Sequence, residues 1–564
     1  MLLNLLVIAP FVAAILMVLN SKVDSEASSR MAILLGSVFA VLSVALIITG
    51  NQATTPIEWF YIPGVRGPVY YYLYAHGLGA WMVFLSCGLS LVALISARRG
   101  TTNKGYRNFA IGIFALMGSM NGTFLAADAV LFFFFFEAMV IPAAILIAGF
   151  GGEKRITAAM TFAIYTLVGS APMMVALWYL LTIADNSLLI SMAAAVQSIP
   201  PENQTLVLLS FLLAFLVKTP IFPFHGWQAI TYAEAPAPLS AILTGAMSKA
   251  GVFGFIAWIL PLFPMSIDGI SSLLWLGLIT AVYGALMALR ANDGKRLLAY
   301  SSMSHLGFAV AGVFSLSEAM LPAVLVLLVA HGISAGAQYF LMGIAERMTG
   351  TRNITEMGGL SKKNPVFSFL FGAAGIMALA VPGTAGFVGE FTVLLSLWDL
   401  GPLPALVGGI CLILSATYVL RFIQMVIFGK PAREYREGTR TTALEGVAIG
   451  FMLSLLLAFG LHPAFVTNSL NLFDEANTEE VVESVAAHEE VHASHAEEKP
   501  MTAEEIQQLD STLAASGFSE EERAALMDQI QPVEEEAVQE AAAASETEVP
   551  AAEETEKTEA SENE

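Results

Sequence analysis

Ionizable side chains stand in four long apolar stretches of the sequence. They are Glu137 in LFFFFFEAMVIP, Lys218 in FLVKTPIFPFHGW, Lys249 in ILTGAMSKAGVFGF and Glu390 in VPGTAGFVGEF. Each such group costs about 2.5–3.5 kcal/mol at the centre of a membrane helix, so an embedded charge is a functional candidate by default. A buried group beside a mobile charge can change its protonation near neutral pH. The four residues therefore predict proton exchange inside a membrane, and the alternative is a set of ion pairs that only fixes helix packing.

Two histidines lie between Lys249 and Glu390 in chain order. His305 is in LLAYSSMSHLGF and His331 is in LVAHGISAGAQYF. Imidazole titrates near neutral pH and can pass a proton from one ring nitrogen to the other. We therefore expect a relay through these histidines, with His225 as a possible accessory, although a lone buried histidine is more often a hydrogen-bonded core residue. Nearby hydroxyls that could hold water are those of Tyr300, Ser301, Ser302 and Ser304.

Proline and glycine interrupt two of the apolar stretches. The interruptions are at Pro220 and Pro223, and at Pro382 and Gly383. Proline breaks a helix, and a broken helix in a membrane is tolerated only where protein or a wet cavity surrounds it. The two breaks fall in the seventh and twelfth predicted spans, so the five-helix units that contain them face opposite ways. Such inverted repeats are typical of ion-translocating transporters.

The composition identifies the elements that must position these residues. The 564 residues are 56% hydrophobic and 13% charged, with a mean hydropathy of +0.70. Soluble domains carry about 25% charged residues, so a soluble enzyme, a collagen and a disulfide scaffold are excluded. A spanning helix needs about 20 mostly apolar residues. The sequence predicts an all-α polytopic membrane protein with fourteen spans, at residues 2–20, 31–50, 77–97, 107–124, 126–149, 157–183, 205–222, 239–262, 271–289, 297–316, 319–344, 366–398, 403–427 and 442–466.

These spans divide into five expected parts. Three N-terminal helices precede the first five-helix repeat (helices 4–8), the second repeat (helices 9–13), a final span and a tail. The respective ranges are 1–106, 107–262, 271–427, 442–466 and 474–564.

Basic residues separate cleanly between the loops. Nineteen lie in the odd-numbered connections, whereas the even-numbered connections hold only Arg66. Lysine and arginine accumulate in cytoplasmic loops, so both termini are expected outside the cytoplasm. Arg421 lies near the cytoplasmic end of its span, where its long side chain can reach the interface.

From Asp474 onward the chain holds 28 acidic and 3 basic residues and no long apolar run. This composition favours a disordered tail. Cys87 and Cys411 form no metal-ligand spacing, and we find no P-loop, no GxGxxG motif and no haem-type CxxCH. No metal, cofactor or nucleic-acid site is therefore predicted in the chain, and a gradient or partner subunits must drive transport.

The longer motifs identify a family. The stretches FEAMVIPAAILIAGFGGEKRITAAMTFAIYTLVGS, VKTPIFPFHGWQAITYAEAPAPLSAILTGAMSKAGVFGF, DGKRLLAYSSMSHLGF and AHGISAGAQYFLMGIAERMTGTRNI resemble the antiporter-like subunits of respiratory complex I, over roughly residues 75–430. The residues that match this family's relay motif are Glu137, Lys218, Lys249, His305 and His331. The glutamate at position 390 is similar to the M branch of the family, because the L and N branches carry lysine at the matching position. The acidic tail, and the lack of an aspartate ahead of AEAPAPLSAILTGAMSK, depart from the M pattern.

The resemblance implies a membrane-arm subunit of a bacterial NADH–quinone oxidoreductase in the cytoplasmic membrane. Its partners would be L-, N- and K-like membrane subunits, lipid and a redox arm that carries FMN and iron–sulfur clusters, with quinone as the substrate of the complex. Quinone reduction would open or close a Glu137–Lys218 ion pair, and a proton would pass by Lys249 and the histidines to Glu390.

Two other functions remain open. The chain could belong to a multi-subunit Na⁺(K⁺)/H⁺ antiporter, or to a related membrane-bound hydrogenase or ferredoxin-dependent complex. Glu390 and the lack of a carboxylate cluster for sodium favour the proton-translocating subunit of a redox complex over these alternatives. A packing scaffold without transport is the third possibility.

Overall fold

The structure is a computed structural model that describes residues 1–19, 25–50, 52–98, 103–263, 272–317, 319–429 and 440–468. The acidic tail, residues 474–564, lies outside the described residues. The described chain is mostly helical, as predicted.

Four long helices and two small sheets form the N-terminal part. The helices are α1 (Leu2–Leu19), α2 (Ser25–Thr49), α3 (Gly77–Ala97) and α4 (Asn103–Leu125). Between α2 and α3, the antiparallel strand pairs are β1 (Gln52–Ala53) with β4 (Tyr74–Ala75), and β2 (Ile57–Tyr61) with β3 (Pro68–Tyr71). The sequence analysis did not predict these strands.

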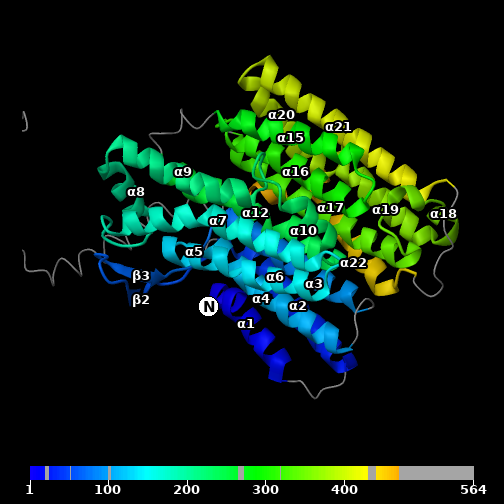
Figure 1. The fold of residues 1–564 in the computed structure, drawn as a ribbon, viewed down its shortest axis with the longest axis horizontal. Helices are drawn as coiled ribbons and strands as arrows, with labels where there is room; N and C mark the ends of the chain where they lie inside the picture. Colours follow the sequence, from blue (N-terminus) through cyan, green and yellow to red (C-terminus); the bar gives the residue numbers. More distant parts are fainter. Residues whose placement is uncertain are drawn as a thin grey trace, which may run out of the picture. The chain divides into compact units, whose positions relative to one another are not determined.

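The next helices contain the first break. They are α5 (Ala129–Ala138), α6 (Val140–Phe150), α7 (Arg155–Leu181), α8 (Leu189–Ser198), α9 (Pro201–Lys218) and α10 (Gln228–Glu234). The predicted span at 239–262 is a helix with two π-helical turns, made of α11 (Ala237–Ile242), η1 (Leu243–Met247), α12 (Lys249–Gly254), η2 (Phe255–Ile259) and α13 (Leu260–Leu262). Helix α8 lies at the same end of the bundle as β2 and β3 (Figure 1).

The remaining helices contain the second break. They are α15 (Leu273–Arg290), α16 (Gly294–Val313), α17 (Met320–Thr349), η4 (Ile354–Glu356), α18 (Leu360–Lys363), α19 (Pro365–Ala378), α20 (Ala385–Asp399), α21 (Pro402–Ile427) and α22 (Ala443–Leu461). Helices α1 and α2 form one flank of the bundle and α21 forms the opposite flank (Figure 1).

Eleven helices among the described residues are long and apolar enough to cross a membrane. The chain is therefore an integral, multi-pass membrane protein. The other three predicted spans are also helical. Two of them, α9 and α16, carry charged residues in their end turns, and the third is divided into α19 and α20. The total of fourteen spans and the inverted repeats stay predictions.

Both helix breaks lie where the sequence predicts them. The first, between α9 and α10, contains Pro220 and Pro223, and the second, between α19 and α20, contains Pro382 and Gly383. Gly383 has a φ of +95°, a backbone conformation that glycine adopts without steric cost. The breaks are confirmed, and each lies beside a charged residue.

Burial sorts the helices into an inner and an outer set. In α17, 83% of the apolar window is buried inside the chain, whereas in α2 the buried share is 33%. The helix from Ala237 to Leu262 is the most buried of the candidate spans, at 89%. The helices that carry Lys249 and His331 are therefore surrounded by protein, and the outer helices shield them from lipid.

Helices α15 and α16 pack backbone against backbone. A Cβ atom added at Gly277 or at Gly284 would lie 2.7 Å from a backbone nitrogen of α16, and one added at Gly307 would lie equally close to α15. Small residues permit such close approach between membrane helices. Gly307 is two residues after His305, so this contact holds the part of α16 that carries His305 against α15.

Candidate functional site

Glu390, His305 and His331 meet in the interior of the second half of the described chain. Glu390 Oε1 lies 3.1 Å from His305 Nδ1, and both side chains are only 8% exposed. The rings of His305 and His331 have centroids 4.8 Å apart. Residues from α16, α17 and α20 thus form one titratable cluster, and the structure brings together these three predicted residues.

Hydroxyl groups surround this cluster. The Tyr418 hydroxyl lies 3.4 Å from His305 Nε2 and 2.8 Å from Ser301 Oγ. Ser415 Oγ donates to the same hydroxyl at 3.1 Å. His331 Nε2 lies 3.2 Å from Ser302 Oγ. Sequence reasoning missed Tyr418, whose only signal was its hydroxyl group, near those of Ser415 and Thr417, within an apolar span.

Lys249 is fully buried and bonds to its own helix. Its Nζ donates to the Thr244 carbonyl at 2.8 Å. The amide of Ser248 bonds at 3.0 Å to the Leu243 carbonyl, five residues back, as the π-helical turn η1 requires. π-Helical turns are frequent at functional sites. Lys249 is also close enough to His331 to interact with it electrostatically.

Lys218 and Glu137 form the other end of the predicted relay. Lys218 is 1% exposed, and its Nζ lies 4.7 Å from the centroid of the Phe136 ring. The two charges interact electrostatically, but among the described residues no ion pair joins Glu137 to Lys218. The sequence analysis expected a pair that opens or closes; in this structure its members are apart.

Buried polar atoms without a protein partner gather around these two charges. Within the part of the chain that the structure describes, they are both carboxylate oxygens of Glu137, Lys218 Nζ and Thr219 Oγ1. A buried polar group without a partner usually marks an internal water. A Cβ atom added at Gly251 would overlap Thr219 Oγ1, so the end of α9 touches the helix of Lys249.

His225 does not join the relay cluster. Its Nε2 lies 3.3 Å from the Tyr283 hydroxyl on α15, and its ring stacks on Phe222. Arg421 bonds to the Ala291 carbonyl and the Asn292 side chain in the loop before α16. This agrees with the expected position of Arg421 at a helix end.

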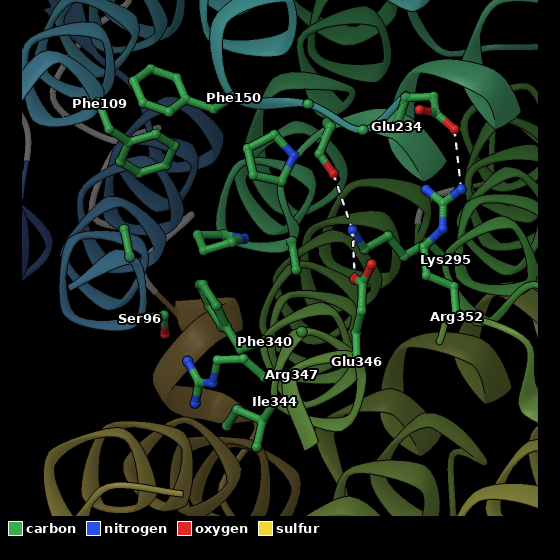
Figure 2. Close-up of a pocket in the computed structure, with 18 of the residues that line it drawn as sticks. Ser96, Phe109, Phe150, Glu234, Lys295, Phe340, Ile344, Glu346, Arg347 and Arg352 are labelled. Carbon is green, nitrogen blue, oxygen red and sulfur yellow. Dashed lines mark hydrogen bonds and ion pairs between the residues drawn. The ribbon is translucent and has the colours of Figure 1, made fainter. Parts of the chain in front are cut away.

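A polar cavity of about 610 Å³ lies where the ends of several helices meet. Lys295 Nζ is 2.9 Å from Glu346 Oε2 and donates to the Ala235 carbonyl at 3.3 Å (Figure 2). Arg352 is 3.1 Å from Glu234 Oε1 (Figure 2) and 3.4 Å from Asp293 Oδ2. The cavity therefore joins the first break, through α10, to the start of α16.

Glu234 receives several stabilising contacts in this cavity. Burial alone raises the pKa of its carboxyl group, but a hydrogen bond from the Lys154 amide and the ion pair with Arg352 outweigh burial, so that the pKa lies below its ordinary value. The carboxylate is therefore held in its charged form. The sequence analysis did not single out Glu234 or Arg352.

No group of three or more His, Cys, Asp or Glu side chains that could hold a metal ion occurs among the residues described. The cluster offers titratable groups and hydroxyls instead. Such an arrangement can accept and release protons in sequence.

Comparison with known proteins connects this fold and site to a family. Residues 126–415 match the family model described as NADH:quinone oxidoreductase/Mrp antiporter, TM. This range covers both breaks and all six predicted relay residues. The chain belongs to this family of antiporter-like membrane subunits, and the resemblance inferred from the sequence is confirmed.

The relatives narrow the class further. NADH-quinone oxidoreductase subunit M of Pseudomonas aeruginosa is 32% identical over 487 residues, which are 82% of this chain and 94% of that protein. The chain thus groups with the M subunits. In a structure of respiratory complex I from Thermus thermophilus with bound NADH, one chain superposes with a TM-score of 0.74 at 29% identity, covering 84% of this chain and 100% of that one. An Mrp complex from a Dietzia species shares the fold, with a TM-score of 0.70 at 20% identity over 84% of this chain and 97% of its own.

Proposed function

We propose that the chain moves protons as a membrane-arm subunit of an NADH–quinone oxidoreductase, coupled to electron transfer in partner subunits. The relay runs through Glu137, Lys218, Lys249, His331 and His305 to Glu390. One observation carries the proposal: three titratable side chains from three different helices meet inside the protein, where His305 contacts both Glu390 and His331.

The geometry at His305 suits proton transfer. Its Nδ1 faces Glu390 and its Nε2 faces the Tyr418 hydroxyl. Imidazole can take a proton on one nitrogen and release the other proton from the second nitrogen. A proton that reaches Nε2 through the hydroxyls therefore leaves toward the Glu390 carboxylate, and the net charge of the ring is restored.

Glu137 and Lys218 couple the relay to charge changes in the partner subunits. Glu137 and Lys218 lack hydrogen-bond partners among the described residues, so their energies respond strongly to a nearby charge. A charge change in a neighbouring subunit moves Lys218 toward or away from Glu137 and drives its proton to Lys249. The end of α9 touches the helix of Lys249, because Thr219 lies against Gly251.

The remaining parts of the complex are those that the family resemblance implies. Partner membrane subunits of the L, N and K types would adjoin this chain, and a peripheral arm would carry FMN and iron–sulfur clusters and reduce quinone. We place the redox centres in those partner subunits. It would lie in the bacterial cytoplasmic membrane with both termini outside.

The test compares Lys218→Ala and Glu390→Gln in the complete complex, reconstituted in vesicles. We expect NADH oxidation coupled to proton pumping to fall by about 10²-fold or more, the usual contribution of a proton-transferring group. Lys363→Ala and Glu153→Gln, at exposed sites, are matched controls. Normal pumping by assembled complexes of both test variants would refute the relay.

The same vesicles discriminate the antiporter alternative. A gradient-driven antiporter exchanges sodium or potassium for protons without NADH. Cation exchange by this chain and its partners in the absence of NADH would favour that alternative.

A further inference from the structure

We propose that Gln228 holds a buried water molecule that joins the Tyr232 hydroxyl and Ser248 to Lys249, and that this water supplies protons to Lys249. The inference rests on the proposed relay and adds a positioning residue to it. Gln228 does not transfer the proton itself, because a neutral amide neither gains nor loses one near neutral pH.

Gln228 is the first residue of α10 and is 1% exposed. Neither its Nε2 nor its Oε1 has a hydrogen-bond partner among the residues that the structure describes. A primary amide carries two donors and one acceptor oxygen, and native proteins seldom leave such groups unpaired in their interior. Water can satisfy both ends of the amide at once.

Tyr232 lies one helical turn after Gln228, on the same face of α10. It is fully buried, and its hydroxyl donates to the Leu243 carbonyl at 3.0 Å. The side chains of Gln228 and Ser248 both lie near this hydroxyl, yet neither end of the Gln228 amide makes a well-formed hydrogen bond within the described chain. A water beside the amide and the hydroxyl would supply the bonds that the amide lacks.

Ser248 connects this group to the relay. Its Oγ donates at 3.0 Å to the Thr244 carbonyl, which also accepts from Lys249 Nζ at 2.8 Å. The Thr244 hydroxyl, on the same turn, is a further buried group without a partner within the described part of the chain. Three polar atoms that need water thus flank the turn that holds Lys249: the two of the Gln228 amide and Thr244 Oγ1.

Lys249 has two kinds of polar contact. It interacts electrostatically with His331, and it donates to the Thr244 carbonyl, which also accepts from Ser248. The ammonium group releases a proton toward His331. The water at Gln228 then passes to Lys249 the proton that Lys218 releases, so that the charge of Lys249 is restored in each cycle.

The experiment uses the complete complex with the substitutions Gln228→Met, Gln228→Ser and Tyr232→Phe. Methionine matches the length of glutamine but does not hold water, and serine leaves room for water beside a hydroxyl. We expect Gln228→Met and Tyr232→Phe to lower the pumping rate about tenfold, below the 10²-fold floor for a group that transfers protons, and Gln228→Ser to keep most of it. Tyr106→Phe is the matched control, because Tyr106 is also buried and donates to a backbone carbonyl, that of Leu94, at 3.0 Å.

A map of the complex that resolves waters supplies an independent readout. We expect density for a water within hydrogen-bond distance of the Gln228 amide, and loss of that density in Gln228→Met. Wild-type pumping by an assembled Gln228→Met complex, or an amide bonded directly to protein atoms in the map, overturns the inference. If Lys218→Ala and Glu390→Gln abolish pumping while Gln228→Met does not change it, the relay stands and only the role of Gln228 fails. If Gln228→Met does not assemble, Tyr232→Phe and Gln228→Ser decide by the same criteria.

Discussion

Substitution of Arg352 by methionine tests the bridge between the first break and α16. The Arg352 guanidinium contacts Glu234 and Asp293, which belong to helix ends far apart in the sequence. Methionine keeps much of the apolar stem and removes the charge. Glu234 is left with the hydrogen bond from the Lys154 amide and without its ion pair.

The magnitude follows from burial and distance. At 3.1 Å, with an effective dielectric constant of about 20, two unit charges attract by about 5 kcal/mol. Removal of one member of a buried pair costs about 3–5 kcal/mol. The Glu234 side chain is 6% exposed and that of Arg352 is 28% exposed, so water compensates part of the loss. We expect a cost near the lower limit, about 3 kcal/mol.

The double variant Arg352→Met with Glu234→Gln is the decisive control. An amide at 234 is neutral, so the most buried carboxylate no longer lacks a partner, and replacement of a whole buried pair is often nearly neutral. Asp293 also loses its ion pair, but its side chain is 24% exposed, so water compensates part of that loss. The thermal midpoint of the purified complex should therefore be lowest for Arg352→Met and should partly recover in the double variant. If the double variant is less stable than the single one, the bridge is not an electrostatic pair.

The pH dependence gives a second check of the same bridge. Burial opposes ionization of Glu234, but the Lys154 amide and Arg352 outweigh it and lower its pKa below the ordinary value of 4.5. A carboxyl group with a lowered folded-state pKa contributes stability above its unfolded pKa, and this contribution is lost as pH falls through the folded-state value. The difference in thermal midpoint between the wild type and Glu234→Gln should therefore shrink on acidification below pH 4.5. A difference that grows on acidification contradicts this assignment.

Three further substitutions probe other contacts. Tyr418→Phe removes the hydroxyl that faces His305; we expect an assembled complex whose proton pumping falls about tenfold, below the 10²-fold floor for a transferring group, and unchanged pumping would exclude this hydroxyl from the path. Gly251→Ala forces a Cβ atom against Thr219, and overpacking of this kind costs about 1–3 kcal/mol, which a lowered thermal midpoint should report. Asp128→Ala removes the side chain that caps α5 and binds the Tyr70 amide; loss of a cap costs about 0.5–2 kcal/mol, and Asp128→Asn should retain more stability because its oxygen still accepts from the helix amides.

The residues of the site that the sequence predicts are those whose placement in a membrane helix has a high free-energy cost. A charge in an apolar stretch, or a proline in a helix, has a penalty that can be read without any knowledge of packing. For this reason Lys249, Glu390 and both breaks are visible in the sequence. The contact of Glu390 with His305 was expected only as a member of a relay, and the structure adds its geometry.

The partners of these residues could not be read in the same way. Tyr418 and His305 are 113 residues apart, and Glu234 and Arg352 are 118 apart. Such contacts depend on which faces of distant helices pack together, and the helix period alone does not specify this. The hydrogen bond from Lys249 to the Thr244 carbonyl depends on a π-helical turn, and no residue type in this segment predicts such a turn.

The strands β2 and β3 were missed for a different reason. The residues of IEWFY and PVYY are aromatic or β-branched for the most part, and proline and glycine lie between them in PGVRG. This pattern favours a hairpin. A search for runs of about 20 apolar residues does not detect strands of two to five residues.

The two halves of the relay differ in how well their charges are satisfied. His305 and Glu390 contact each other, and Lys249 bonds to a carbonyl, whereas Glu137 and Lys218 are buried without hydrogen-bond partners within the described chain. An unsatisfied buried charge has the most to gain from a small movement or from a water molecule, because its desolvation is not yet compensated. A satisfied pair is held in place by the bonds it already makes. In the proposed relay, an external charge would therefore act at Glu137 and Lys218, and Lys249, the two histidines and Glu390 would pass on the proton that this change releases.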